Sequence, residues 1–284
     1  MRVIFLGGDL RQKYACDYLN IYNINSEFYP NFDLNQDMKN SIQNASLIAL
    51  PIPICKDDKY LNITGANLID LYEILSLLNK NSLVLGGKFT SNAKDYLLNK
   101  GIQYIDYFDI DSFQIQNALL SAEGAIYYAK QRLDRSISGL EIAILGFGRI
   151  GKILAYLLSL QGAKITVCCR KESDFAWSKL IGFNAVKIKN WGNRSNLESL
   201  DDNYDIIFNT IPYRIMDESF ARKYNGNTLI IDLASYPFGM DESIAKEYKL
   251  KYYREPGIPG RYAPKSAGEI IGETIINNLH YKEE

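Results

Sequence analysis

The chain has 284 residues, of which 47% are hydrophobic and 23% charged, and its formal net charge is −1. This balance is typical of a globular protein with a sizeable core, and it lacks the concentrated basic charge of a nucleic-acid binder. No run of about 18 apolar residues is present, and the N-terminus lacks the apolar stretch of a signal peptide, so we expect a cytoplasmic protein without a membrane span. The four cysteines have no paired metal spacing, and no metal site is expected.

Short apolar runs alternate with helical patterns in the first part of the chain. Strands are expected at 3–6, 47–50, 82–85 and 102–107, and helices from Gly8 to about 19 and over 68–78. Glycine or proline follows three of the four strands, as is typical of a parallel sheet covered by helices on both faces. We therefore expect a substrate-side α/β domain over residues 1–120.

A linking helix is expected next, within residues 121–135, and a second α/β unit over 136–255. Its strands are expected at 142–145, 165–169, 185–188, 206–209, 229–233 and near 251–253. Residues 256–284 are expected to begin as an irregular loop, to form a helix from about Ala267, and to return toward the first domain. The sequence thus predicts two α/β domains with parallel sheets.

A glycine-rich turn opens the second unit: Gly146-Phe147-Gly148-Arg149-Ile150-Gly151. It follows an apolar strand and opens an apolar helix within a strand–helix–strand unit of about 30 residues, which is the context of a dinucleotide-binding turn. Gly146 permits the tight turn, Gly148 lets a pyrophosphate approach the backbone, and Gly151 lets helix and strand pack closely. The helix N-terminus offers N–H groups to the phosphates. The alternative is a turn with a packing role only.

The end of the following strand indicates which dinucleotide is bound. NAD enzymes usually carry an acid there that bonds the ribose 2′-OH, whereas this strand ends in Cys169, followed by Arg170 and Lys171. Two cations suit a 2′-phosphate, and Ser173 could add a hydrogen bond. We therefore expect NADP rather than NAD, the alternative being a solvated basic pair beside Glu172.

Two later strand ends should also face the cofactor, because ligands of open α/β sheets bind beyond the carboxyl ends of the strands. The first gives Asn209, Thr210, Ile211 and Pro212, which we expect near the nicotinamide ribose. The second gives Asp232 and Ser235, which could contact the ligand or only cap local backbone.

Cations near both ends of the chain suggest an anion site. Arg11 and Gln12 follow two glycines at the start of a helix, while Arg261, Lys265 and Ser266 follow a segment rich in proline and glycine before another helix. Arg11, Arg261 and Lys265 could together receive a substrate with two carboxylates. Each of these cations alone is more often a surface charge.

The motifs as a set resemble the dipicolinate synthase A-subunit family. The matching segments, in the same order, are 7–12, 122–126, 145–151, 209–212, 231–235, 256–260 and 263–268. The resemblance implies an α/β fold of two Rossmann-like domains with an active site in the inter-domain cleft, similar to alanine and 2-hydroxyacid dehydrogenases. It also implies oxidation of a dihydrodipicolinate-type intermediate of the lysine pathway to pyridine-2,6-dicarboxylate, in the mother cell of a sporulating bacterium.

The partner that the resemblance implies is the flavoprotein-like B-subunit of dipicolinate synthase, and we expect a homo-oligomer. The oxidation needs positioning and a modest base, for which Glu123 and Asp232 are the candidates. A structural role for Glu123 is equally open. The alternatives are another alanine- or 2-hydroxyacid-type dehydrogenase and a non-catalytic cofactor-binding subunit. A 2-hydroxyacid dehydrogenase would need a histidine paired with a carboxylate, yet the single histidine, His280, lies near the C-terminus.

Overall fold

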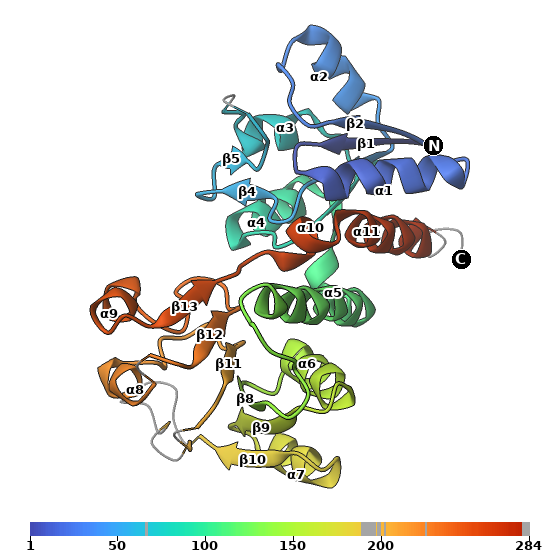
Figure 1. Ribbon diagram of the computed structural model, residues 1–284. Coiled ribbons are helices and arrows are strands. Elements are labelled where there is room, and N and C mark those ends of the chain that lie inside the picture. The colour runs from blue at the N-terminus through green and yellow to red at the C-terminus, as the bar shows by residue number, and fades with distance from the viewer. Residues whose placement is uncertain (66–67, 189–196, 198–199, 202, 225, 280–284) are drawn as a thin grey trace. The chain divides into compact units, whose positions relative to one another are not determined.

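The computed structural model describes residues 1–65, 68–188, 197, 200–201, 203–224 and 226–279 (Figure 1). His280 lies outside these residues. The chain forms two compact units, Met1–Asn117 with Ala263–Glu284, and Ala118–Tyr262. It passes from the first to the second within α5 (Asp111–Lys130) and returns before α11 (Pro264–Leu279).

The first unit is built on a five-stranded parallel sheet with the order β2-β1-β3-β6-β7, the flavodoxin-like order of doubly wound folds. The strands are β1 (Arg2–Leu6), β2 (Asn25–Tyr29), β3 (Leu47–Ala49), β6 (Leu83–Gly86) and β7 (Gln103–Asp106). Its other elements are α1 (Leu10–Ile21), α2 (Gln36–Gln43), α3 (Leu71–Leu77), α4 (Ser91–Lys100), the 3-10 helix η1 (Tyr107–Asp109), and the antiparallel pair β4 (Cys55–Lys56) and β5 (Tyr60–Leu61).

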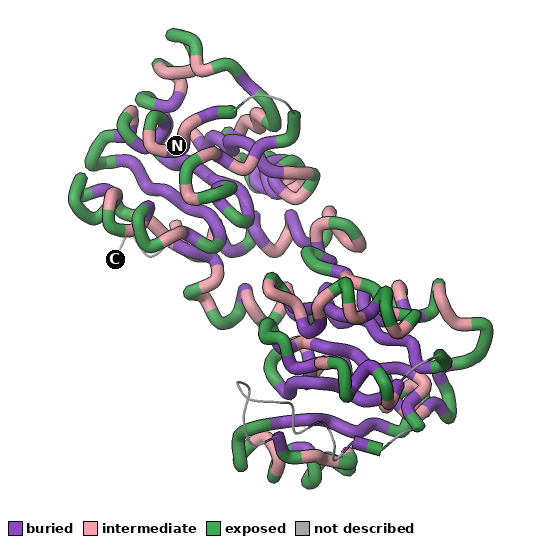
Figure 2. The backbone as a smooth tube through the Cα atoms, turned by 90° about the vertical axis from the view of Figure 1, so that its left-hand side faces the viewer, coloured by how far each residue is buried: buried purple, intermediate pink, exposed green. Residues whose placement is uncertain are grey.

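Alternate residues of these strands enter two separate cores. Ile4 and Ile48 pack toward α2, α3 and α4, whereas Val3 and Phe5 pack toward α1 and α11. This alternation is expected, because successive side chains of a strand point to opposite faces of the sheet, and helices cover both faces here. Figure 2 shows these strands as buried tube inside a more exposed rim.

Two glycines let α11 pack closely against α1. A Cβ on Gly268 would lie 2.6 Å from the carbonyl oxygen of Arg11, and one on Gly272 would lie 2.5 Å from Cδ1 of Tyr18. Successive turns of α11 thus meet successive turns of α1, so the helices run parallel with their N-termini at the same end. The irregular loop expected before Ala267 is shorter than predicted: only residues 256–257 and 263 are irregular, and α10 (Ile258–Tyr262) and the first turn of α11 occupy the rest.

The second unit carries a six-stranded parallel sheet with the order β10-β9-β8-β11-β12-β13, which is the Rossmann order 3-2-1-4-5-6. The strands are β8 (Glu141–Leu145), β9 (Lys164–Cys169), β10 (Asn184–Lys187), β11 (Ile206–Asn209), β12 (Leu229–Asp232) and β13 (Lys251–Arg254). Side chains of α5, α6 (Arg149–Leu160) and α7 (Glu172–Leu180) enter one core of this sheet. Side chains of α8 (Glu218–Lys223) and α9 (Glu242–Glu247) enter the other.

The linking helix is longer than the sequence pattern indicates. We expected it to start near residue 121, but α5 starts at Asp111, because Phe113 and Ala118 continue the buried stripe toward the N-terminus. Within the described residues, no helix combines the length and apolar character that a membrane crossing needs.

Candidate functional site

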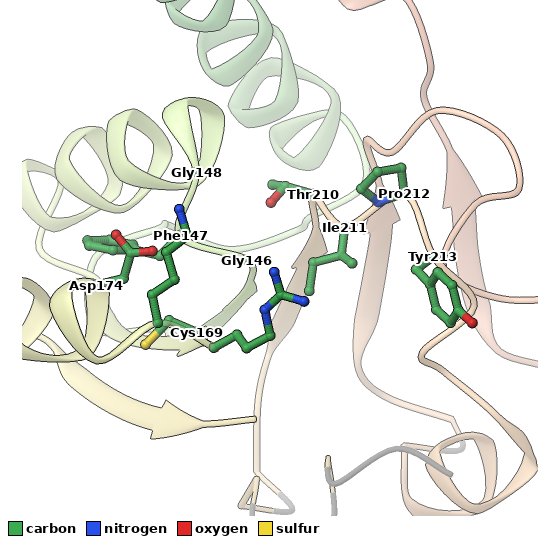
Figure 3. Close-up of a pocket in the computed structure, with 11 residues that line it drawn as sticks. Gly146, Phe147, Gly148, Cys169, Asp174, Thr210, Ile211, Pro212 and Tyr213 are labelled. Atoms are coloured by element: carbon green, nitrogen blue, oxygen red, sulfur yellow. The ribbon is translucent and has the colours of Figure 1, made fainter. Parts of the chain in front are cut away.

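A pocket of about 410 Å³ opens beyond the carboxyl ends of β8, β9 and β11 (Figure 3). Three segments line it, one after each strand: Gly146, Phe147 and Gly148; Cys169, Arg170, Lys171 and Asp174; Thr210, Ile211, Pro212 and Tyr213. Most of the residues expected to bind the cofactor therefore meet here. Arg149, Ile150 and Gly151 instead form the first turn of α6, and Ser173 is an exposed residue in the first turn of α7.

Each glycine of the turn has a different physical reason to lack a side chain. Gly146 has a φ of +100°, and a Cβ there would lie 2.4 Å from Oγ1 of Thr210. A Cβ on Gly151 would lie 2.1 Å from the carbonyl oxygen of Gly146, so the helix could not approach the strand. A Cβ on Gly148 would meet nothing within 4 Å. Gly148 thus faces open space in the pocket, where a ligand can approach the backbone.

The helix N-termini at this pocket differ from most others in the described chain. Six α-helices begin with a side chain that accepts a hydrogen bond from the first turn: Asp9, Asn35, Asp70, Thr90, Asp217 and Asp241. The N-caps of α6 and α7 are Gly148 and Lys171, and neither makes such a side-chain bond. No N-cap side chain therefore covers the first turn of either helix, and both N-caps line the pocket.

The charge beside β9 is mixed, with acids and cations close together at the pocket. Asp174 pairs with Nζ of Lys152 at 3.0 Å, and Glu172 pairs with Lys187. Arg170 and Lys171 are exposed at the strand end. Burial raises the pKa of the Cys169 thiol, which therefore stays protonated and forms a weakly polar wall. The sequence pattern does not predict Asp174 in the lining, because the acid typical of NAD enzymes stands at the strand end, whereas Asp174 lies in α7.

We expected Asn209 to line the pocket, but it is fully buried and is not among the lining residues. Its Nδ2 donates to the carbonyl oxygen of Ile211 at 3.1 Å, and its Oδ1 accepts from the backbone N–H of Ile211 at 3.1 Å. Oγ1 of Thr210 donates to the carbonyl oxygen of Leu145 at 2.9 Å. Asn209 therefore shapes the segment that forms this wall of the pocket.

Asp232 is also fully buried, and four donors surround its carboxylate. These donors are Nδ2 of Asn209 at 2.8 Å, the backbone N–H of Ala234 at 3.1 Å and of Gly239 at 2.6 Å, and the hydroxyl of Tyr252 at 2.6 Å. Burial and the Asp232 charge raise the pKa of Tyr252 well above its usual range, so this hydroxyl remains a donor. Asp232 therefore holds the local backbone in place, which is one of the two roles expected for it. A carboxylate with four donors is not favoured as a catalytic base. Ser235 is exposed.

The remaining predicted residues of the second unit have different surroundings. Glu123 is half-buried in α5, and its side chain makes no hydrogen bond or ion pair among the residues that the structure describes. Arg261, on α10, donates to Oε2 of Glu255 at 2.8 Å, and Arg132 donates to Oε1 of the same buried carboxylate at 2.6 Å. Arg261 and Arg132 therefore share one buried carboxylate, which holds Arg261 in place.

In the first unit, Arg11 and Gln12 line a second pocket of about 420 Å³. It is lined by Gly8, Asp9, Arg11, Gln12, Ile52, Lys56, Asn62, Ile63, Thr64 and Gly65. Lys265 and Ser266 do not line it: both are exposed on α11, where Nζ of Lys265 lies 4.0 Å from Glu269. Lys56, Asn62 and Thr64 come from the β4–β5 region, which carried no motif that could have identified them.

Comparison with known proteins agrees with this geometry. The family model described as NADP oxidoreductase coenzyme F420-dependent matches residues 141–236, which include the glycine turn and its pocket. The structure of D-lactate dehydrogenase from Escherichia coli has a TM-score of 0.69 at 14% identity, covering 100% of this chain and 97% of that one, and shows the shared fold. Fold and site define an NAD(P)-dependent oxidoreductase with a Rossmann-type sheet.

The particular family is indicated by three further matches. The model of the N-terminal domain of the dipicolinate synthase A-subunit matches residues 2–108. The dipicolinate synthase A-subunit of Bacillus subtilis is 32% identical over 198 residues, an alignment that spans 67% of this chain and 64% of the relative. The structure of the A-subunit from Bacillus halodurans has a TM-score of 0.85 at 25% identity, covering 98% of this chain and 97% of that one. All three matches are to the dipicolinate synthase A-subunit family, and together they extend over both units of this chain.

Proposed function

We propose that this chain is the oxidoreductase component of a dipicolinate synthase, and that NADP binds in the pocket of the second unit. The observation that carries the cofactor assignment is the pair of uncapped helix N-termini, those of α6 and α7, at one pocket beside Arg170 and Lys171. A dinucleotide with a third phosphate needs two anion sites, one for the pyrophosphate and one for the 2′-phosphate. The pocket offers both kinds of site.

The residues present fit this cofactor. Gly148 leaves open space in front of the α6 N-terminus, where the pyrophosphate would lie. Lys171 is the N-cap of α7, so the 2′-phosphate would meet first-turn N–H groups as well as two cationic side chains. The acids in the first turn of α7 are partnered by Lys152 and Lys187, which reduces their repulsion of a phosphate. When bound, the nicotinamide supplies the acceptor for a hydride.

The substrate that we propose is a dihydrodipicolinate-type dicarboxylate, which loses a hydride and a proton and becomes aromatic. Arg11 supports carboxylate binding, because Asp9 and the carbonyl oxygen of Ile52 hold its guanidinium in one orientation. Aromatisation supplies driving force, so the protein mainly has to position the ring and accept a proton. Since four donors saturate Asp232, Glu123 is the better candidate for the base.

The B-subunit of a dipicolinate synthase is the proposed partner, by analogy with the family, and sporulation is the proposed setting. A non-catalytic cofactor-binding role is the second candidate, because the described residues pair Arg261 with Glu255 and leave Lys265 beside Glu269. All three cations expected at the substrate thus have a carboxylate neighbour, since Arg11 also pairs with Asp9 at 2.8 Å.

The test is formation of the aromatic dicarboxylate, followed by its ultraviolet absorbance. The purified chain is mixed with the lysine-pathway intermediate and NADP, with and without the B-subunit. We expect product in at least one of the two mixtures, and a lower rate when NAD replaces NADP. Binding of NADP without product in either mixture would support the non-catalytic role instead.

A further inference from the structure

The antiparallel pair of β4 and β5, here called the β4–β5 hairpin, contributes a lysine to the wall of the first-unit pocket. Cys55 stands opposite Leu61 in this pair, and both side chains are buried in the core of the first unit. Successive side chains of a strand point to opposite faces, so Lys56 lies on the other face of the hairpin. Lys56 is exposed there and lines the pocket. One face of the hairpin is thus anchored in the core, and the other presents a cation.

Backbone hydrogen bonds hold the hairpin at the carboxyl end of the parallel sheet. The N–H of Ile54 donates to the carbonyl oxygen of Gly87, directly after β6, at 3.0 Å. The N–H of Asn62 donates to the carbonyl oxygen of Ile54 at 3.0 Å. The carbonyl oxygen of Asn62 accepts from the N–H of Gly8, between β1 and α1, at 2.8 Å. The backbone of Lys56 therefore has a set position relative to the start of α1.

The other cation of the pocket, Arg11, is held at that start of α1. Its Nε and NH2 donate to the Asp9 carboxylate at 2.9 and 2.8 Å, and NH2 also donates to the carbonyl oxygen of Ile52 at 2.9 Å. Within the described chain NH1 makes no hydrogen bond, so Arg11 keeps donors for one carboxylate of a ligand. Asp9 is already bonded to Arg11, which reduces its repulsion of a bound anion.

The charges of the pocket come from two separate elements. Among the residues that the structure describes, three charged side chains line it: Asp9 and Arg11 at the start of α1, and Lys56 on β4. Lys56 makes no ion pair within the described chain. The volume of about 420 Å³ lies within the range of small-molecule sites. When one carboxylate of a small ligand satisfies Arg11, the cation that remains for a second carboxylate is Lys56.

We infer that Lys56 binds the second carboxylate of a dicarboxylate whose first carboxylate is bound by Arg11. The β4–β5 hairpin is then the element that distinguishes dicarboxylates from monocarboxylates. This inference deepens the proposed function and rests on it for the identity of the substrate. Lys56 takes the part that the sequence pattern gave to Arg261 and Lys265, which lie beside Glu255 and Glu269 instead.

The test compares pyridine-2,6-dicarboxylate with pyridine-2-carboxylate, which has the same ring and one carboxylate fewer. Each acid is titrated calorimetrically into the full-length chain with NADP present. Neither aromatic acid can be dehydrogenated, so binding is measured without turnover. We expect the dicarboxylate to bind about tenfold more tightly, which corresponds to one charge-assisted hydrogen bond at the lower end of its range, because Lys56 is exposed.

The variant Lys56→Met keeps the length of the side chain and removes its charge. It should weaken binding of the dicarboxylate about tenfold and leave binding of the monocarboxylate unchanged. Lys59→Met is the matched control, because it removes the same charge from the turn of the same hairpin, but Lys59 does not line the pocket. It should keep the tenfold preference. Lys56→Arg retains the charge and should keep most of the preference.

Equal affinity of the unmodified chain for the two acids would overturn the inference, and this result does not depend on the folding of any variant. Equal weakening of both acids in a folded Lys56→Met chain would overturn it as well, because Lys56 would then share one carboxylate with Arg11. If the preference holds and depends on Lys56, but the chain forms no aromatic dicarboxylate, the failure counts against the proposed function alone.

Discussion

Replacing Gly148 by alanine should weaken cofactor binding with little effect on the stability of the fold. The backbone there has a φ of −79°, and the added Cβ would meet no atom within 4 Å, so the folded chain accepts the methyl group. We expect stability to change by less than about 1 kcal/mol, because alanine restricts the unfolded chain but is a poorer helix N-cap than glycine. The methyl group enters the space proposed for the pyrophosphate, and crowding of about 1–3 kcal/mol would weaken NADPH binding roughly 5- to 150-fold.

The comparison variant is Gly151→Ala, three residues further along the same turn. Its Cβ would lie 2.1 Å from the carbonyl oxygen of Gly146, so it should lower the melting temperature. NADPH fluorescence titration and thermal unfolding measure the two effects on each variant. Full NADPH affinity in a folded Gly148→Ala chain would refute the proposed position of the pyrophosphate.

Three more variants test other parts of the account. Replacing Arg170 and Lys171 together by serine should weaken NADPH binding at least about tenfold and NADH binding much less, since charge-assisted hydrogen bonds contribute about 1.5–3 kcal/mol each; equal losses for both cofactors would argue against a 2′-phosphate site. Asp232→Asn should lower the free energy of unfolding by about 3 kcal/mol in urea denaturation, because it breaks a buried charged network; normal stability with lost turnover would instead restore Asp232 as the base. Gly268→Ala should lower the melting temperature, because its Cβ would lie 2.6 Å from the carbonyl oxygen of Arg11, whereas Ser266→Ala, exposed on the same helix, should not.

The glycine turn and the central strands could be predicted from the sequence because their signals are local. The apolar runs around Gly146 and the cations at 170 and 171 follow one another in the chain, and they also meet in the structure. The edge strand β2 escaped prediction, since Asn25, Ser26 and Glu27 give it no apolar run.

Residues whose partners are distant in the sequence were assigned less well. Asp232 looks like a free acid at a strand end until Gly239 and Tyr252 fold against it. Gly268 and Gly272 lie within the helix expected from about Ala267, but their role could not be predicted, because it depends on α1, about 250 residues earlier in the chain. Proline at the first position of a helix, as in α11, is compatible with helix and does not by itself indicate a loop.

The most direct test of NADP-dependent oxidation follows the hydrogen itself. The intermediate is labelled with deuterium at the ring carbon that loses the hydride, and is incubated with NADP, this chain and the B-subunit. The account predicts one deuterium on C4 of the nicotinamide for each aromatic dicarboxylate formed, as measured by mass spectrometry. Aromatic product without deuterium on NADPH would contradict it, because the hydride would then have left by a route that does not use the cofactor of this chain.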